Sequence, residues 1–549
     1  MRAARRIAPG GVNGDMTRPR LSDFGLAVLS GLLVVACFPR FDLDWLAWIA
    51  LVPLLLALDR ATATRAMLLG QLTGVVFFVG VFEWIWQVPA YNVLDEAILG
   101  LYLALYFAVW AFGLRWLTGR VAVPAALVAP ALWVAMEYFR GHAGFLSLPW
   151  MLLGHSQYRN PLLIQVTSIT GVYGVSFLIV LVNVAVADSV AAIAETARPR
   201  RWAWRAIPVS TGVAVAAVAI VVLHGLIVLS AEPARETLTV AAIQGNVPQN
   251  VKWDAAHREN TLQRYAELTR EAARHQPALI AWPETAVPGD VEHDPRLLKP
   301  VRELAREVGI PLLVGSAEHA KFTKREYGSR TYNSMVLLNP DGRIAGAYRK
   351  IRLVPFGEYA PLQDYFTWPA TIASSMGDSV AGDTPTVFRI GAVGVASTIC
   401  WENIFADLVR QFVRQGARIV INATNEAWFQ DSGAPRQFLA ISVFRAAEHR
   451  VSVLRVANTG ISAVIDPSGR IVQRLRSPDG RDVFVAGVLT ASLPVSRATT
   501  FYTTHGDVFA VGLAVACGVL AVAVAGLRVA RWLAGGKLRR IRFDKAPVT

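Results

Sequence analysis

Eight apolar runs dominate the pattern of hydrophobic and polar positions, seven of them before residue 231 and one near the end of the chain. A helix needs about 20 mainly apolar residues to cross the hydrocarbon core of a membrane. The runs at 44–58 and 122–138 are short, so their ends are the least sharply defined. We therefore predict eight transmembrane helices, at residues 22–38, 44–58, 66–86, 97–117, 122–138, 162–187, 208–230 and 508–530.

From Leu238 onward the pattern changes to short β-branched runs, which are typical of buried strands. Amphipathic stretches, as expected of helices, separate several of these runs, and this alternation predicts an α/β domain. "NPDGR" at 339–343 and "DPSGR" at 466–470 indicate tight turns between strands. The expected strands are 238–244, 278–284, 311–317, 334–340, 393–400, 417–424, 452–458 and 462–467, and the expected helices are 257–275, 298–308, 403–415 and 434–449.

Composition agrees with this division of the chain. Apolar residues make up 54% and charged residues 17%, whereas soluble domains carry about 25% charged residues, so a purely soluble protein is excluded. The prediction is a membrane protein with an eight-helix bundle and one extramembrane α/β domain. Its parts are a basic tail at 1–21, seven transmembrane helices at 22–235, the α/β domain at 236–500, and an eighth helix with a second basic tail at 501–549.

The net charge of +14 lies mostly outside the α/β domain, since residues 236–500 hold 30 Lys and Arg against 26 Asp and Glu. Basic residues accumulate on the cytoplasmic side of membrane proteins, so the excess indicates topology rather than a nucleic-acid partner. Both Arg-rich ends are expected in the cytoplasm, which places residues 236–500 outside it. The apolar run ending in "VVAC" at 34–37 could instead be a lipoprotein signal peptide, but Phe38 and Pro39 lead straight into another apolar run.

Some polar and aromatic residues lie at the extracytoplasmic ends of the predicted spans. They are Glu83 with Trp84 and Trp86, Glu137 with Arg140, and Trp150 in "LPWMLLGHSQ" at 148–157. Charged residues at membrane depth are functional candidates. The alternative is an interfacial belt of aromatic residues with ordinary charges beside it.

Three reactive side chains occur at the ends of predicted strands or beside them. Glu284 closes "LIAWPE", Cys400 closes "VASTIC", and Lys350 lies in "AYRKIRLVPFGEY". A cysteine between a strand and a helix lies near a helix N-terminus, whose partial positive charge favours the thiolate. If the carboxylate and the ammonium converge on it, they make a base and an oxyanion stabiliser for a nucleophile. Each of these residues taken singly is equally compatible with a structural role.

The order and spacing of "WPE", "RKIRLVPFGEY" and "ICWE" resemble those of the nitrilase (carbon-nitrogen hydrolase) superfamily. Within it, the predicted spans and "QGNVPQNVKWD" at 244–254 resemble the apolipoprotein N-acyltransferase family. This resemblance implies an αββα sandwich. It also implies transfer of a fatty acyl chain from a glycerophospholipid to a diacylated apolipoprotein, at the periplasmic face of the bacterial inner membrane.

The resemblance also implies roles for particular residues. Glu284 corresponds to the general base, Lys350 to the catalytic lysine and Cys400 to the nucleophile. The supporting residues would be Glu358, Trp401, Glu402 and Trp253. Two positions depart from the family's pattern: Trp401 stands where Tyr is expected, and Glu426 stands where Asp is more usual. Glu358 could instead form a simple surface ion pair.

The segment at 361–378 carries several large apolar side chains in a loop-like composition. We expect an apolar lid that dips toward the bilayer, although a loop folded onto the domain core has the same composition. Tyr365, Phe366 and Trp368 of this lid, together with Trp150, are the expected lipid contacts.

No cofactor or metal is expected. The nine histidines show no paired ligand spacing, and the chain has no glycine-rich phosphate loop. Two rival functions share parts of the pattern. A membrane-anchored amidase would pass the acyl group to water, and a transporter or receptor would only bind a ligand with its outer domain.

Overall fold

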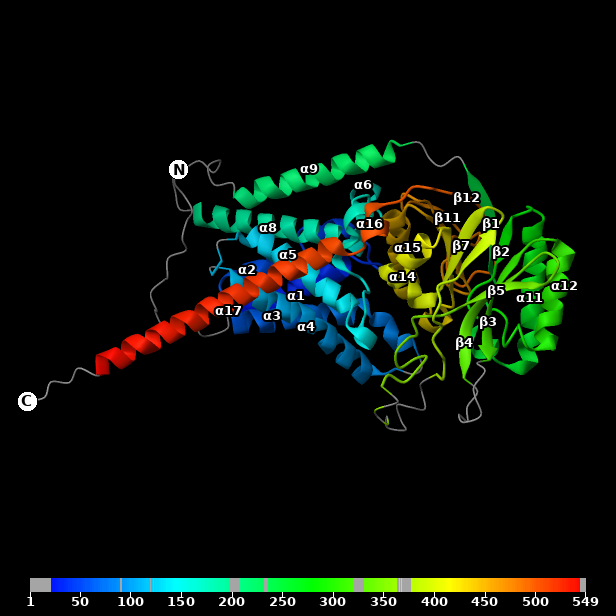
Figure 1. The fold of residues 1–549 in the computed structure, drawn as a ribbon, viewed down its shortest axis with the longest axis horizontal. Coiled ribbons are helices and arrows are strands. Elements are labelled where there is room, and N and C mark those ends of the chain that lie inside the picture. Colours follow the sequence, from blue (N-terminus) through cyan, green and yellow to red (C-terminus); the bar gives the residue numbers. More distant parts are fainter. Residues whose placement is uncertain are drawn as a thin grey trace, which may run out of the picture.

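The structure is a computed structural model that describes residues 21–543, apart from 89–90, 119, 122, 197–207, 232–235, 320–329, 363–364, 366 and 368–376. Its first half is a bundle of apolar helices, and the last helix of the chain lies beside them (Figure 1). The longer helices are α1 (Leu21–Ala36), α2 (Val52–Asp59), α3 (Ala63–Val81), α4 (Val93–Leu117), α5 (Ala125–Gly141), α8 (Tyr173–Thr196), α9 (Val209–Leu229) and α17 (Val508–Phe543). Short helical turns connect them, namely η1 (Asp44–Trp48), η2 (Glu83–Gln87), η4 (Leu153–Gln157), α6 (Pro161–Ile164) and α7 (Thr167–Thr170).

Within the described residues, five helices are long and apolar enough to cross a membrane: α3, α4, α8, α9 and α17. The predicted count of eight is therefore not confirmed. The predicted span 44–58 divides into η1 and the eight-residue α2, which at 1.5 Å per residue is about 12 Å long. The predicted span 162–187 divides into α6, α7 and α8, with Gly171 at φ +63° between the last two.

The α/β part contains two six-stranded sheets, ordered β12-β1-β2-β3-β4-β5 and β11-β10-β9-β8-β7-β6. In each sheet three neighbouring strands run parallel, β1 to β3 and β7 to β9. The first sheet consists of β1 (Thr237–Gln244), β2 (Leu279–Ala281), β3 (Leu312–His319), β4 (Thr331–Leu338), β5 (Ile344–Arg349) and β12 (Gly487–Pro494). The second consists of β6 (Val387–Ile390), β7 (Val393–Ile399), β8 (Ala417–Thr424), β9 (Ser452–Ala457), β10 (Ala463–Ile465) and β11 (Ile471–Arg474).

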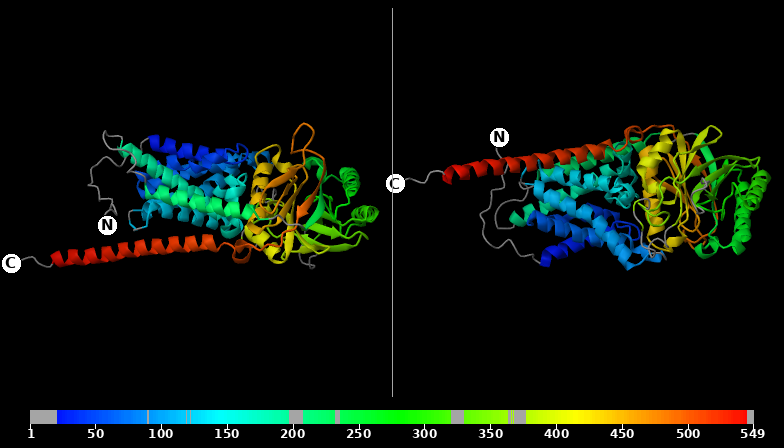
Figure 2. Two further views of the ribbon diagram at one scale, coloured as in Figure 1. Left: turned by 90° about the horizontal axis from the view of Figure 1, so that it is seen from above. Right: turned by 60° about the horizontal axis from the view of Figure 1, so that its bottom comes forward.

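Helices cover the outer face of each sheet, which makes the αββα sandwich (Figures 1 and 2). Helices α11 (Arg258–Ala273) and α12 (Pro295–Val308) pack on the first sheet, and α14 (Ala406–Arg414) and α15 (Ala434–His449) pack on the second. Both expected turns are confirmed, because "NPDGR" joins β4 to β5 and "DPSGR" joins β10 to β11 as antiparallel pairs.

Helix α15 lies between the second sheet and the helical bundle, and every residue from Ala434 to His449 except Arg436 is buried. The same hydrophobic core extends from α1, α3 and α5 through α15 to the strands of the second sheet. A second, smaller core lies between the first sheet and α11 and α12. The α/β part is thus packed onto the bundle through α15.

Gln437 joins α15 to the bundle by hydrogen bonds. Its carbonyl oxygen accepts from the indole nitrogens of Trp84 and Trp150 at 3.0 and 2.8 Å. Its amide nitrogen donates to the main-chain oxygens of Pro39 and Val81 at 3.0 and 2.9 Å. We call these five residues the Gln437 clasp. It accounts for two of the aromatic residues that the sequence placed at the ends of spans.

Candidate active site

Cys400 follows strand β7 and begins a short 3₁₀ turn, η7 (Cys400–Ile404). Its backbone has φ +53°, a conformation that is uncommon for residues other than glycine. The side-chain nitrogen of Asn422, on β8, donates to the Cys400 main-chain oxygen at 3.0 Å. The turn therefore presents the cysteine at the end of a parallel strand, with its backbone held from the neighbouring strand.

The expectation that a helix N-terminus favours the Cys400 thiolate is wrong. Helix α14 begins only at Ala406, six residues after the nucleophile. Burial raises the pKa of the Cys400 thiol well above its ordinary value, the Glu284 carboxylate raises it further, and Lys350 opposes both. The sulfur is thus a protonated thiol at neutral pH, and a base has to remove its proton.

Glu284 lies just beyond strand β2, and both of its carboxylate oxygens are held. The side-chain nitrogen of Asn333, on β4, donates to Oε1 at 2.7 Å. The backbone N–H of Asn425, just beyond β8, donates to Oε2 at 2.8 Å. Because one donor comes from each sheet, the carboxylate is fixed between the two halves of the sandwich.

Lys350 follows strand β5 and is almost fully buried, at 1% exposure. Its Nζ lies 2.7 Å from Oε1 of Glu358 and 3.7 Å from Oε1 of Glu284. Burial opposes the positive charge, but the two carboxylates more than offset this effect and raise the pKa of Lys350 above its ordinary value. Lys350 is therefore a charged ammonium at neutral pH.

Glu358 and Glu402 fix the chain around Lys350. Oε2 of Glu358 accepts from the Val354 backbone N–H at 2.8 Å. Glu402 is fully buried, and its carboxylate accepts four hydrogen bonds from the chain around the site. The Tyr348 hydroxyl donates at 2.8 Å and the Ile351 backbone N–H at 2.7 Å. The other two donors are the backbone N–H groups of Arg352 and Ile399. Glu402 thus ties the segment after Lys350 to the turn that contains Cys400.

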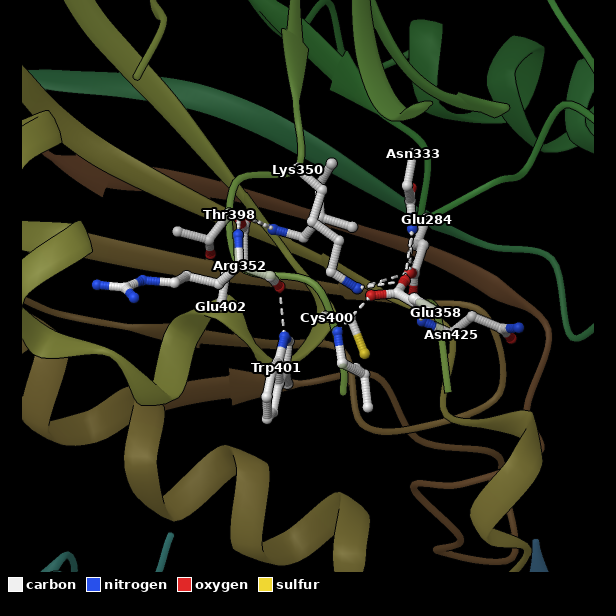
Figure 3. A network of polar contacts seen from close by, with 12 residues as sticks. Glu284, Asn333, Lys350, Arg352, Glu358, Thr398, Cys400, Trp401, Glu402 and Asn425 are labelled. Carbon is white, nitrogen blue, oxygen red and sulfur yellow. Dashed lines mark hydrogen bonds and ion pairs between the residues drawn. The ribbon is translucent and has the colours of Figure 1, made fainter. Parts of the chain in front are cut away.

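Figure 3 shows the side chains of Cys400, Lys350, Glu284 and Glu358 gathered at one place, although they come from the ends of three strands and one loop. The arrangement combines a thiol, a fixed carboxylate and a buried cation. A carboxylate beside a thiol can act as general base, and a cation can stabilise an oxyanion. Such a site can carry out nucleophilic acyl transfer through a thioester.

Sequence analysis missed three polar residues that complete this site: Asn333, Asn425 and Lys252. Lys252 is buried, and its Nζ donates to the Glu284 main-chain oxygen at 3.0 Å. Burial lowers the pKa of Lys252 to about 8, although Glu284 and Cys400 favour its charge. Lys252 lies in the motif "QGNVPQNVKWD", and Asn425 directly precedes Glu426, one of the two positions that depart from the family's pattern.

The remaining expected site residues lie in different places. The Trp401 indole nitrogen donates to the Arg352 main-chain oxygen, so a ring N–H supplies a hydrogen bond at the position where a phenolic hydroxyl was expected. Trp253 is 52% exposed and follows Lys252 directly. Tyr365 is 90% exposed, whereas Phe366 and Trp368 lie outside the described residues. Trp150 is buried in the Gln437 clasp and does not lie beside Cys400, Glu284 and Lys350.

A cavity of about 420 Å³ lies between the bundle and the α/β part, next to the turn that carries the nucleophile. Its walls include Phe145 and Ser147 after α5, Arg352 after Lys350, and Trp401 and Phe405 after Cys400. In the part of the chain that the structure describes, no group of three or more His, Cys, Asp or Glu side chains is placed to hold a metal ion.

Comparison with known proteins gave two family matches. Residues 30–185 match the apolipoprotein N-acyltransferase N-terminal domain, and residues 239–501 match the carbon-nitrogen hydrolase domain. The apolipoprotein N-acyltransferase of Geobacter metallireducens is 37% identical over 517 residues, covering 90% of this chain and 95% of that protein. The enzyme of the same name from Chlorobaculum tepidum is 32% identical, covering 94% and 99%.

A solved amidase of the nitrilase superfamily, from Nesterenkonia AN1, aligns with a TM-score of 0.37 at 18% identity. The alignment covers 50% of this chain and 96% of the amidase.

Proposed function

Because the chain belongs to the apolipoprotein N-acyltransferase family, we propose that it transfers a fatty acyl chain from a membrane phospholipid to an apolipoprotein. The acceptor is the α-amino group of the N-terminal S-diacylglyceryl-cysteine, and the intermediate is a thioester on Cys400. The observation that carries the proposal is the meeting of Cys400, Glu284 and Lys350 in a sandwich packed on apolar helices.

In the first half-reaction, Glu284 takes the thiol proton as the sulfur attacks the ester carbonyl of the phospholipid. A C–S bond forms, and the ester C–O bond breaks. Lys350 and the backbone N–H of Trp401 stabilise the tetrahedral oxyanion, and losing one such donor costs about 3 to 4 kcal/mol. Glu284 then gives its proton to the oxygen of the leaving lysophospholipid.

In the second half-reaction, the neutral α-amino group of the acceptor attacks the thioester carbonyl. Glu284 takes one proton from the nitrogen as the C–N bond forms and passes it to the sulfur as the C–S bond breaks. The products are an amide and the original thiol, so the enzyme is ready for another cycle. Glu358 keeps Lys350 oriented throughout, at a distance of 2.7 Å.

The raised pKa of the Cys400 thiol suits this mechanism. A permanent thiolate would be open to oxidation and to water-borne electrophiles, whereas this thiol is activated only when Glu284 takes its proton. A thioester also has to be kept from water if transfer to an amine is to compete with hydrolysis. The position of the site, above a bundle of apolar helices, supports substrates that are lipids.

The membrane arrangement is part of the same proposal. The protein lies in the bacterial inner membrane with eight spans, both ends in the cytoplasm and the catalytic domain at 236–500 on the periplasmic side. The basic residues at the two ends support this orientation. Most of the segment predicted as a lid, 361–378, lies outside the described residues, and Tyr365 within it is 90% exposed.

Intact-mass measurement tests the proposal directly. Purified protein incubated with phospholipid should gain the mass of one acyl chain on the 59.7 kDa chain, and a diacylated lipopeptide should then remove it and become triacylated. Cys400→Ser, Glu284→Gln and Lys350→Ala should give no productive adduct. Cys37→Ser and Cys517→Ser are matched controls, because Cys37 directly follows α1, Cys517 lies in α17, and both are buried.

Two results would contradict the proposal. Free fatty acid without triacylated peptide would indicate an amidase-like enzyme that uses water as acceptor. A wild-type chain that stays unmodified, together with a Cys400→Ser chain that keeps its biological function, would indicate a protein that only binds ligands.

A further inference from the structure

We infer that Arg455 is a positioning residue that holds both the nucleophile and the base of the site. It does so through Asn422 toward Cys400 and through Glu426 and Asn425 toward Glu284. This inference rests on the proposed function, because it assigns Arg455 a part in forming the thioester.

Arg455 lies on β9, beneath the site, and is fully buried. Its guanidinium is paired with the Glu426 carboxylate, which is also fully buried. The same guanidinium donates to Asn422 Oδ1 at 2.8 Å, to Ser442 Oγ at 3.1 Å and to the Ile461 main-chain oxygen at 3.2 Å. A buried charge is costly unless it is paired and hydrogen-bonded, and here it is satisfied by four partners that surround the site.

The branch to Cys400 runs through the Asn422 amide. Because Arg455 holds the amide oxygen, the amide nitrogen has to face the other way, where it donates to the Cys400 main-chain oxygen at 3.0 Å. The Cys400 backbone, at φ +53°, persists only where the surroundings enforce it. Arg455 therefore fixes which way the Asn422 amide points and, through it, the backbone of the nucleophile.

The branch to Glu284 runs through Glu426. Glu426 is adjacent in sequence to Asn425, whose backbone N–H donates to Glu284 Oε2 at 2.8 Å. The side chain of Asn425 is held in turn by Asn458, at 3.0 Å. The ion pair between Glu426 and Arg455 thus fixes the Asn425 backbone, which in turn orients Glu284.

Gly460 shows that the chain is shaped around this ion pair. A Cβ atom at position 460 would lie 1.7 Å from Oε2 of Glu426, so any other residue there would displace the Glu426 carboxylate. Glu426 is one of the two departures from the family's pattern noted in the sequence. The carboxylate of this longer side chain occupies the space that the missing Cβ at 460 leaves open.

A second buried arginine provides a matched control. Arg445, on α15, is 1% exposed and is paired with Glu448 at 2.9 Å. It donates to the Ile404 main-chain oxygen at 3.3 Å. Among the described residues, its hydrogen bonds and its ion pair do not include Cys400, Glu284, Asn422 or Asn425. Arg455→Lys and Arg445→Lys therefore remove the same planar guanidinium from equally buried pairs. Arg445 reaches the η7 turn only at Ile404, four residues after Cys400, so only Arg455→Lys releases Asn422 and Glu426.

The test compares these two variants of the full chain in detergent by three measurements. The first is the rate of acyl-adduct formation with phospholipid. The second is the rate at which iodoacetamide alkylates Cys400 at different pH values, measured by peptide mapping. The third is the unfolding temperature. We expect Arg455→Lys to slow adduct formation about 10- to 100-fold, the effect of a misplacement near 1 Å, and to move the pH profile of alkylation. Arg445→Lys should lower the unfolding temperature and leave both Cys400 measurements near wild type.

Asn422→Ser keeps the ion pair but releases the Cys400 main-chain oxygen, so it serves if Arg455→Lys fails to fold, and the same changes are expected. The inference is overturned if Arg455→Lys or Asn422→Ser forms the adduct at the same rate as Arg445→Lys and shows the same pH profile of alkylation. If the proposed function itself is wrong, the wild type will form no adduct, and the alkylation profiles will still decide whether Arg455 positions Cys400.

Discussion

At the scale of single residues, Lys252 provides a sensitive test of the site's electrostatics. Its pKa of about 8 means that it is charged at pH 7 and neutral above pH 9. When charged, it favours the Glu284 carboxylate and the Cys400 thiolate that forms during reaction, because each of these raises its pKa in return. Its contribution is therefore present below pH 8 and is lost as the pH rises.

We expect Lys252→Met to slow adduct formation about tenfold at pH 7, as for a loss near 1.4 kcal/mol, with the ratio to wild type approaching one above pH 9. Lys252→Arg keeps its charge throughout, so it should follow the wild type at pH 7 and exceed it at pH 9. The rates are measured by intact mass from pH 6 to 10. A constant ratio of Lys252→Met to wild type across this range would show that the Lys252 charge has no part in the reaction.

Trp401 differs from the family's expected tyrosine, yet it supplies a hydrogen bond to the Arg352 main-chain oxygen. Trp401→Phe removes that bond and should slow adduct formation about threefold to tenfold, because one hydrogen bond contributes about 0.5 to 1.5 kcal/mol. Trp401→Tyr restores a donor and should lie closer to wild type. Trp532→Phe, on the exposed end of α17, is the control, and equal rates for Phe and Tyr at 401 would refute the role of the donor.

The sequence predicted the reactive residues better than their supports. Glu284, Lys350, Cys400 and Glu358 lie in motifs whose order is visible along the chain. Asn333 and Asn425 reach Glu284 from β4 and from the end of β8, so their roles depend on how two sheets stack. No local pattern encodes that stacking.

At the scale of elements, strands were predicted where they are buried and β-branched, as in β1, β7 and β8. The shorter or more exposed β6 and β11 lacked that signal. The spans were harder to define, because apolar composition alone does not show that the run at 44–58 divides into η1 and α2. Helix α15 was predicted at 434–449. Its burial on nearly all sides was not predicted, because that burial depends on packing against the bundle.

The Gln437 clasp leads to a prediction for α15. Gln437→Leu would leave two indole N–H groups and two main-chain oxygens without their partner, and a buried unpaired group costs about 1 to 3 kcal/mol. We expect a clearly lower unfolding temperature in detergent by differential scanning fluorimetry. Gln263→Leu, on the exposed face of α11, should leave it unchanged, and similar values for both variants would contradict a docking role for the clasp.

At the scale of the whole molecule, the bundle and the sandwich share one core, and covalent connection is not what holds them together. Helix α17 packs on α5, α16 (Phe501–His505) packs on α7, and α15 packs on η4. Strands β1 and β12, which carry the chain into and out of the sandwich, are paired antiparallel over eight residues.

Cleaving the chain between α9 and β1 should therefore leave one particle. A protease site inserted at residues 232–235 should give two fragments on a denaturing gel that still elute together in mild detergent and still form the Cys400 adduct. The same cut in a Gln437→Leu chain should weaken this association. Separation of the fragments in the otherwise native chain would show that the linker, and not the shared core, holds the halves together.

The burial of α15 between the bundle and the second sheet has a further consequence for substrates. Cys400 follows a strand of the second sheet, and this sheet is packed on the bundle through α15. The distance from its sulfur to the lipid is therefore fixed once the protein has folded. Under the proposed function, each substrate has to extend its reacting atom across that distance while its chains stay in the bilayer. The enzyme would then select substrates by the distance between their membrane-embedded chains and their reacting atom, as well as by their chemistry.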